Sequence, residues 1–306
     1  MAQVLKWGRA NVPSSGLRTA RMPAVLKMGD EEKVISAHAG THERPPARLR
    51  LYKLSKHIFG GILFQVHRML EALHIGFWLG FLDGDQINAV VFHHYEEADL
   101  YRTAAHNLHG FIPYEKELVK DHFNVCRSVV VAAAGGGREM IALAQTGVQV
   151  DGFECNPGLV DQCKEFLAQA GVSARILNSA PDEVPAGLRT YDGGIVGWGA
   201  FAHIVGRTRR INFLRDLKSH LHHGAPLFVS VGRRPEGSKY YAVIYQLART
   251  IRKLRRSADA IELGDDLLNC FSHRFVESEL RSELQEAGFK VIKCVEVHEI
   301  YAVAQA

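Results

Sequence analysis

Residues 129–139, VVVAAAGGGRE, join a β-branched run to a loop of small residues. The run predicts a buried strand, and the loop could be either a flexible hinge or a place where a ligand approaches the backbone. A helix is expected from Arg138, and its free amide groups could meet a negative or polar group. Glu154 ends the next predicted strand, where a carboxylate can accept hydrogen bonds from both hydroxyls of a ribose. Together these features favour a loop that binds a nucleoside-like ligand.

The composition is that of an ordinary globular protein, with 306 residues, 47% of them hydrophobic and 23% charged. This length suits one large α/β domain, with or without a smaller cap. The net charge of +4 is concentrated in two places. Residues 1–56 contain eleven Lys or Arg against four Asp or Glu, and residues 249–256 (RTIRKLRR) contain five more. Such clusters can bind nucleic acid or anionic lipid, or can simply form a solvated surface.

The five cysteines form no CxxC pair and no zinc spacing, which favours a reducing compartment and argues against a structural disulfide or metal site. No signal-peptide pattern is visible at the N-terminus. The most apolar stretch, residues 57–82, is interrupted by His57, Gln65, Arg68 and Glu71, so it predicts amphipathic helices rather than a membrane span. We therefore expect a cytoplasmic protein.

Three regions are predicted along the chain. Residues 1–46 read as a partly ordered basic arm that ends at a Pro-Pro pair, because no hydrophobic period is sustained there. Residues 47–123 read as a helical cap, and residues 124–306 as the main domain with a basic helical insertion at about 233–262. The apolar stripe expected to pack the cap consists of Leu63, Val66, Leu70 and Leu73.

In the main domain, short β-branched runs alternate with helical segments, which predicts a doubly wound, mostly parallel seven-stranded sheet with helices on both faces. The expected strands are 128–133, 148–154, 174–178, 193–197, 226–231, 290–297 and 300–306, and the expected helices are 138–146, 157–170, 207–222, 238–256 and 275–289. The gap between the last two strands is hairpin-sized, so they must be antiparallel. The sheet therefore has one reversed strand near its C-terminal edge.

The glycine loop, the acidic strand end and the reversed strand together resemble the class I S-adenosylmethionine-dependent methyltransferases over about residues 100–306. The first motif of that family is an acidic residue followed by Gly-x-Gly-x-Gly. Here the glycine positions fall on Ala133, Gly135 and Gly137, and the acidic position falls on Val131. The resemblance implies a Rossmann-like fold, S-adenosylmethionine as the cofactor and methyl transfer as the reaction.

Because Val131 carries no acid, the resemblance requires another group to contact the methionine end of the cofactor, such as Arg138 with Glu139 or a residue of the cap. A nicotinamide-binding Rossmann domain is the main alternative fold. It would want Gly-x-Gly-x-x-Gly, and its third glycine would fall on Arg138. The reversed strand also fits the methyltransferase better.

The resemblance implies which residues form the site. The expected cofactor contacts are Tyr101, Ala133, Ala134, Gly135, Gly136, Gly137, Glu154, Cys155, Asn178, Ser179, Ala180, Trp198 and Gly199. The expected substrate contacts are Tyr95, His106, Phe201 and His273. Segment 93–111 resembles a helix that closes over the cofactor, and its polar positions expected to face inward are Tyr95, Tyr101, His106 and Asn107. Tyr95 and Tyr101 are six residues apart and cannot share one narrow helical stripe, so Tyr101 is assigned to the cofactor and Tyr95 to the substrate.

Methyl transfer from a sulfonium needs alignment, removal of water and, for some acceptors, a general base. Histidine suits a base that titrates near neutrality. Among the sixteen histidines, His203 is the catalytic candidate because it follows the fourth strand at the mouth of the expected crevice. His93 and His94 lie at the entrance of the cap segment and are alternatives.

Three functions remain open on the sequence. The first is a methyltransferase that acts on an oxygen or nitrogen atom of a small molecule. The second is an RNA or protein methyltransferase, suggested by RTRR (207–210), RTIRKLRR and the basic arm. No recognisable RNA-binding module accompanies these clusters. The third is a binding or scaffold protein that retains the cofactor fold without catalysis.

Overall fold

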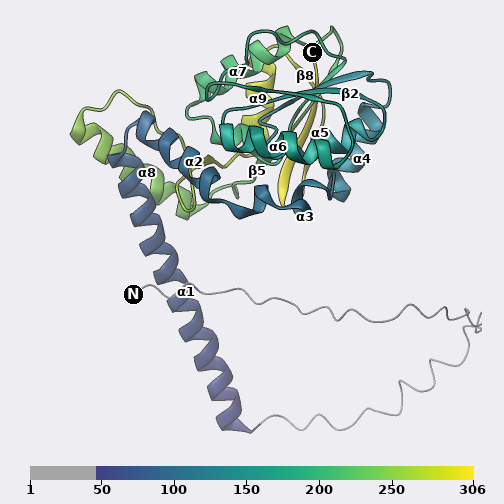
Figure 1. The fold of residues 1–306 in the computed structure, drawn as a ribbon. Coiled ribbons are helices and arrows are strands. Elements are labelled where there is room, and N and C mark those ends of the chain that lie inside the picture. Colours follow the sequence, from purple (N-terminus) through teal and green to yellow (C-terminus); the bar gives the residue numbers. More distant parts are fainter. Residues whose placement is uncertain (1–45) are drawn as a thin grey trace, which may run out of the picture. The chain divides into compact units, whose positions relative to one another are not determined.

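The β-branched runs of the sequence form one central sheet in the structure, a computed structural model that describes residues 46–306. Seven strands lie in the order β3-β2-β1-β4-β5-β9-β8, and helices cover the sheet (Figure 1). The strands are β1 (Ser128–Ala132), β2 (Gln149–Glu154), β3 (Arg175–Asn178), β4 (Gly193–Val196), β5 (Pro226–Gly232), β8 (Lys290–Glu296) and β9 (Glu299–Gln305). Strands β1 to β5 are parallel, which confirms the predicted sheet.

The reversed strand is β9, which pairs antiparallel with β5 on one side and with β8 on the other. Only Val297 and His298 separate β8 from β9. So short a connection can join neighbouring strands only as a hairpin, because a parallel crossover needs a dozen or more residues. The predicted reversal near the C-terminal edge is confirmed.

Both faces of the sheet are buried, as expected for parallel strands. Successive residues of β1 point to opposite sides, so Val129 and Val131 join one hydrophobic cluster and Val130 and Ala132 join the other. The first cluster also contains residues of α4, α5 and α6, and the second contains residues of α7 and α9. The helices on the first face are α4 (Pro113–His122), α5 (Arg138–Ala144) and α6 (Pro157–Gln169), and those on the second face are α7 (Arg207–Ser219) and α9 (Glu277–Glu286).

The chain divides into two units, residues 1–59 and residues 60–306. The predicted arm, residues 1–46, lies outside the described residues except for its last position. Helix α1 (Ala47–Phe81) crosses the boundary between the units, and the sheet belongs to the second unit. Among residues 46–306, no helix combines the length and the apolar character that a membrane crossing would need.

The predicted stripe on α1 is not the buried one. Leu63, Val66, Leu70 and Leu73 are exposed by 54%, 50%, 61% and 43%. The buried positions are Ala72, Ile75, Gly76, Leu79 and Gly80. They pack against α8 (Lys239–Arg255), the helix of the basic insertion. Small residues define the interface because they let the two helix backbones approach, which a search for large apolar side chains overlooks.

Segment 93–111 is not one helix, which corrects the expectation. Helix α2 (Gly84–Glu97) ends at Ala98, whose backbone is extended, and is followed by two short turns, η3 (Asp99–Arg102) and α3 (Ala104–Asn107). Thr103 caps α3, because its hydroxyl accepts a hydrogen bond from the His106 amide at 3.3 Å. After this bend, α3 lies against α5 and η3 lies against α6.

The predicted insertion is followed by a small hairpin that the sequence does not predict, β6 (Asp265–Asp266) and β7 (Ser272–His273). Strands of two residues are too short to produce a periodic pattern. The hairpin lies near η4 (Ala200–His203), the turn that follows β4.

Candidate functional site

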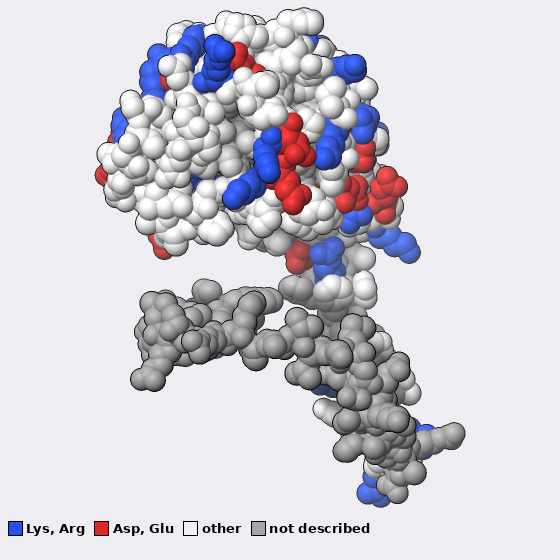
Figure 2. All heavy atoms as spheres, turned by 90° about the vertical axis from the view of Figure 1, so that its right-hand side faces the viewer, with Lys and Arg blue, Asp and Glu red and all other residues white. Residues whose placement is uncertain are grey.

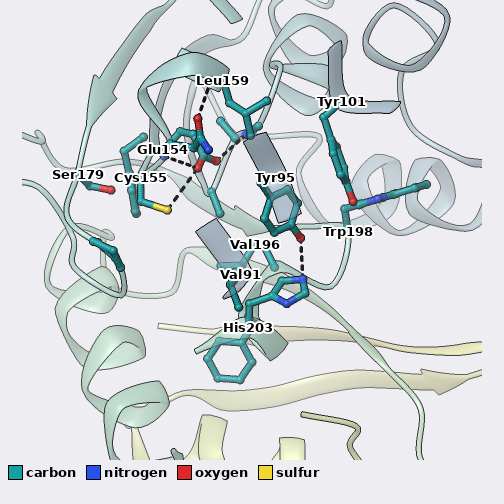
Figure 3. Close-up of a pocket in the computed structure, with 18 of the residues that line it drawn as sticks. Val91, Tyr95, Tyr101, Glu154, Cys155, Leu159, Ser179, Val196, Trp198 and His203 are labelled. Carbon is teal, nitrogen blue, oxygen red and sulfur yellow. Dashed lines mark hydrogen bonds between the residues drawn. The ribbon is translucent and has the colours of Figure 1, made fainter. Parts of the chain in front are cut away.

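A pocket opens at the carboxyl ends of β1, β2 and β4, where the strand order reverses between β1 and β4. Ligands bind at this switch point in doubly wound sheets. Figure 3 shows residues of the pocket, with Glu154 on one side and Tyr95, Tyr101, Trp198 and His203 on the other. The lining comes from the glycine loop, from the ends of β2 and β4, and from the turns after α2.

The glycine loop leaves β1 through three residues with positive φ, Ala133 at 49°, Gly135 at 54° and Gly137 at 93°. This backbone path exposes the Gly135 amide, which donates a hydrogen bond of 2.9 Å to the Glu154 carboxylate. A direct contact therefore joins the loop to the end of β2. The two features that the sequence paired form one structural unit.

Gly136 lies directly beneath the turn that carries Asn107. A Cβ at Gly136 would collide with the Asn107 side chain and with the Tyr101 carbonyl. Gly137 faces the core, where a Cβ would lie 2.7 Å from Cys163 Sγ. The glycines therefore have separate reasons to be small, and both reasons concern packing of this loop.

Glu154 is almost fully buried, and backbone amides hold its carboxylate. Oε2 accepts from Gly135 and Oε1 accepts from the Asn156 amide at 2.9 Å. Each oxygen of a carboxylate has two lone pairs, so acceptor capacity toward the pocket remains. Asn156 also caps α6 through its side-chain oxygen, which leaves its buried Nδ2 without a partner among the described residues.

Tyr95 and His203 form the central polar contact of the opposite wall. Tyr95 Oη lies 2.7 Å from His203 Nε2 (Figure 3), and His203 Nδ1 lies 2.6 Å from the Phe271 carbonyl. A carbonyl can only accept, so Nδ1 carries the proton and Nε2 accepts from the tyrosine hydroxyl. Burial lowers the pKa of His203 and raises the pKa of Tyr95 well above its ordinary value. The pair is therefore neutral near pH 7.

Aromatic rings continue this wall. The ring centroids of Tyr95 and Tyr101 are 5.1 Å apart, those of Tyr101 and His106 are 5.4 Å apart, and those of His106 and Trp198 are 5.1 Å apart. The expectation that Tyr95 and Tyr101 must face different ways assumed one helix. Because the helix ends between them, both rings reach the same pocket.

Most of the predicted site residues line this pocket. They are Tyr95, Tyr101, His106, Ala133, Ala134, Gly135, Gly136, Glu154, Cys155, Ser179, Ala180, Trp198, Phe201 and His203. Phe201 is fully buried and also belongs to the core beneath the pocket.

Four predicted residues do not line this pocket: Gly137, Asn178, Gly199 and His273. Asn178 is exposed at the end of β3, and Gly199 lines a neighbouring cavity. His273 is 2% exposed, and its Nδ1 lies 2.8 Å from Asp265 Oδ1. Side chains alternate along a strand, so its neighbours Ser272 and Arg274 point to that cavity while His273 points away.

Comparison with solved structures gives two neighbours with TM-scores of 0.51. One is described as a SAM-dependent methyltransferase from Methanosarcina mazei, with 15% identity over 64% of this chain and 98% of the other. The other is a 1,6-didemethyltoxoflavin N1-methyltransferase from Burkholderia thailandensis with bound 1,6-didemethyltoxoflavin and S-adenosylhomocysteine, with 14% identity over 73% of this chain and 90% of the other. No protein-family profile and no curated protein sequence matches the chain significantly.

The chain has the fold of the class I S-adenosylmethionine-dependent methyltransferases. The order of the strands in the sheet and the reversed strand β9 agree with the resemblance found in the sequence.

In this methyltransferase fold, the position expected to hold an acid is occupied by Val131, which is buried in the core. Glu139 brings a carboxylate to the nearby end of β4, where a Cβ at Gly197 would lie 2.7 Å from Glu139 Oε1. Arg138 is paired with Glu139 at 2.5 Å and with Glu115 at 2.9 Å. Both Arg138 and Glu139 also line the pocket.

Asn107, which the sequence marked as an inward-facing polar position of segment 93–111 without assigning it a contact, also lines the pocket. Its Nδ2 donates to the Tyr101 and Thr103 carbonyls at 2.8 and 3.0 Å, and its buried Oδ1 has no partner among the described residues. The residue lies at the end of α3, the short helix that follows the bend after α2. In the methyltransferase fold of this chain it places an unused acceptor above the glycine loop.

Proposed function

We propose that the protein is an S-adenosylmethionine-dependent methyltransferase that methylates an oxygen or nitrogen atom of a small-molecule acceptor. The observation that carries the proposal is the hydrogen bond from the Gly135 amide to Glu154 at the switch point of this fold. It fixes a carboxylate where the ribose of a nucleoside cofactor would lie. The cofactor, when bound, supplies an electrophilic methyl group on a sulfonium.

The polar groups of the pocket fit such a cofactor. Glu154 would accept from the ribose hydroxyls, and Asn107 Oδ1 and Glu139 would accept from the ammonium of the methionine end. The unpaired Asn107 Oδ1 supports this role, because a buried acceptor without a partner is costly. Ser179 and Ala180 would border the adenine, with Asp182, whose pKa is raised by burial.

Tyr95 and His203 would remove the proton from the acceptor. The cofactor, held by Glu154, Asn107 and Glu139, would supply its methyl group to the acceptor oxygen or nitrogen, and the electron pair of the carbon–sulfur bond would remain on sulfur. The acceptor's proton passes to His203 Nε2, either directly or through the Tyr95 hydroxyl, which donates to Nε2 as it accepts. The rings of Tyr101, His106 and Trp198 would exclude water from this side of the pocket.

The contacts of the basic segments favour a small acceptor over RNA or protein. In segment 207–210, Arg209 and Arg210 each lie 2.6 Å from a carboxylate oxygen. In segment 249–256, the buried Arg252 donates to two backbone carbonyls. These cations are already used within the fold. On the face shown in Figure 2, the Lys and Arg of the described residues are interspersed with Asp and Glu and form no continuous basic patch.

Calorimetric titration with S-adenosylmethionine and S-adenosylhomocysteine tests the proposal. We expect both to bind, and we expect Glu154→Gln to weaken binding about tenfold or more, because a charged acceptor of buried hydroxyls is lost. Asp161→Asn is the matched control, since Asp161 is an exposed carboxylate on α6 whose partner is Lys164. If the unaltered protein binds neither ligand, the non-catalytic binding protein becomes the better interpretation.

A further inference from the structure

A second cavity adjoins the first. The two share Tyr95, Tyr101, Trp198 and His203 as common walls. The second cavity is otherwise lined by polar groups from the small hairpin and from the ends of β5 and β9. A molecule in it would contact both Tyr95 and His203.

Arg274 provides the cation of this cavity. It follows β7, and its guanidinium lies against Gly232 at the carboxyl end of β5, where a Cβ would collide with it. Glycine at position 232 therefore makes room for the arginine. The placement turns Arg274 toward the cavity while its backbone amide is held by the Gly264 carbonyl at 2.8 Å.

Within residues 46–306, the Arg274 side chain has no ion-pair partner, and its Nε is buried without a hydrogen bond. Neighbouring arginines are satisfied: Arg234 pairs with Glu279, and Arg210 lies 2.7 Å from Glu283. Arg274 is half-buried, and a buried donor such as its Nε costs free energy when it has no partner, so an anion is expected to complete the arrangement.

The acidic residues that line the cavity do not pair with the Arg274 guanidinium. Asp266 Oδ1 accepts from the Leu268 amide at 3.0 Å, and Oδ2 lies 3.4 Å from the Tyr241 hydroxyl. Burial raises the pKa of Asp266 although Arg274 opposes the shift. Glu299, at the start of β9, also lines the cavity, and it forms no ion pair with Arg274 among the described residues.

We propose that the second cavity binds the methyl acceptor, and that the acceptor is a small aromatic carboxylate whose carboxylate pairs with Arg274. The proposal rests on the proposed function. A guanidinium matches a carboxylate with two parallel hydrogen bonds. The Tyr101 and Trp198 rings supply flat apolar surface for an aromatic ring. An acceptor held in this way would present its hydroxyl or amine to the shared wall, next to Tyr95 and His203.

Binding of benzoate and its three monohydroxy derivatives tests the proposal, each compared with the corresponding amide by calorimetry in the presence of S-adenosylhomocysteine. We expect at least one carboxylate to bind tenfold or more tightly than its amide. Arg274→Met should abolish this preference, and Arg274→Lys should retain part of it. The matched control is Arg233→Met, because Arg233 is a partly exposed arginine paired with Glu296 one residue from Gly232.

Binding of S-adenosylhomocysteine separates the two proposals. If the unaltered protein binds it and the Arg274 variants bind it equally well, the cofactor site is intact and the carboxylate preference alone decides the inference. No preference for any carboxylate over its amide would overturn the inference while leaving the proposed function in place. A protein that does not bind S-adenosylhomocysteine contradicts the proposed function first.

Discussion

Two residues of the pocket hold a backbone conformation that side chains rarely adopt. Ala133 has a φ of 49° and Trp198 a φ of 51°. A Cβ in the left-handed region costs about 1–2 kcal/mol, and such strain gathers at ligand sites. Position 133 is one of the glycine positions of the methyltransferase motif, and glycine adopts this left-handed conformation without the cost that Ala133 bears.

Ala133→Gly should therefore raise the free energy of unfolding, by up to about 1 kcal/mol, because relief of strain exceeds the entropy that glycine adds to the unfolded chain. Denaturant unfolding measures the change. Ala134→Gly is the control, because Ala134 is buried in the same loop without a positive φ, and this variant should lose about 1 kcal/mol. Equal losses in both variants would contradict the strain argument.

The proposed base role of His203 predicts a pH dependence. Burial lowers its pKa from the ordinary 6.5, so the imidazole is neutral and able to accept a proton at pH 7 and above. Turnover should be constant there and fall only below the ordinary value, as the imidazole becomes protonated. His203→Gln should lose about a hundredfold in turnover together with this acid limb, while cofactor affinity is retained.

Tyr95→Phe keeps the ring and removes the hydroxyl that donates to His203 Nε2, so it should lower turnover and shift the acid limb. The control for His203→Gln is His222→Gln, since His222 is an exposed histidine away from the pocket. A pH profile that is the same in the unaltered protein and in His203→Gln would remove His203 from the mechanism.

Among the elements, the contact between α1 and α8 depends on small residues. A Cβ at Gly80 would lie 2.7 Å from Ile251 Cβ and 2.9 Å from the Ala248 carbonyl. The same contact is supported by Arg252, whose Nε donates to the Leu79 carbonyl at 3.0 Å. Arg252 of α8 thus helps to hold two helices together, whereas the sequence left the cluster as either a binding surface or a solvated one.

Gly80→Ala should lower the free energy of unfolding by about 1–3 kcal/mol, because the added methyl forces the helices apart. Gly61→Ala on the same helix should instead raise helix stability by about 0.5–1 kcal/mol, since a Cβ there meets nothing within 4 Å. Circular dichroism during thermal or denaturant unfolding compares the pair. Similar effects of the two changes would show that the close approach of α1 and α8 contributes little.

Across the whole chain, the sheet could be predicted from the sequence with boundaries within one or two residues. The runs at 128–133 and 226–231 are β-branched and apolar without alternation, because both faces of β1 and β5 are buried. Strand order near the reversed strand also followed from chain length, since two residues between β8 and β9 allow only a hairpin.

The part of the site that follows from the fold class is the part at the strand ends. The glycine loop and Glu154 each follow a strand whose carboxyl end must lie at the switch point, so their meeting follows from the fold class. Arg274 follows a strand of only two residues, and Asn107 lies on a helix of four residues, so neither element has a periodic pattern. Their positions depend on where α2 ends and on how the hairpin packs against β5.

The amino-acid sequence was sufficient for those features that local pattern and chain length control: the parallel sheet, its reversed strand, and a ligand loop facing an acid. The contact between Tyr95 and His203, the burial of His273 and the unpaired Arg274 depend on residues that are 8 to 108 positions apart in the chain. Packing brings those residues together, because a side chain's partners are set by the faces that its elements bury. The chemistry proposed for this pocket depends on those contacts.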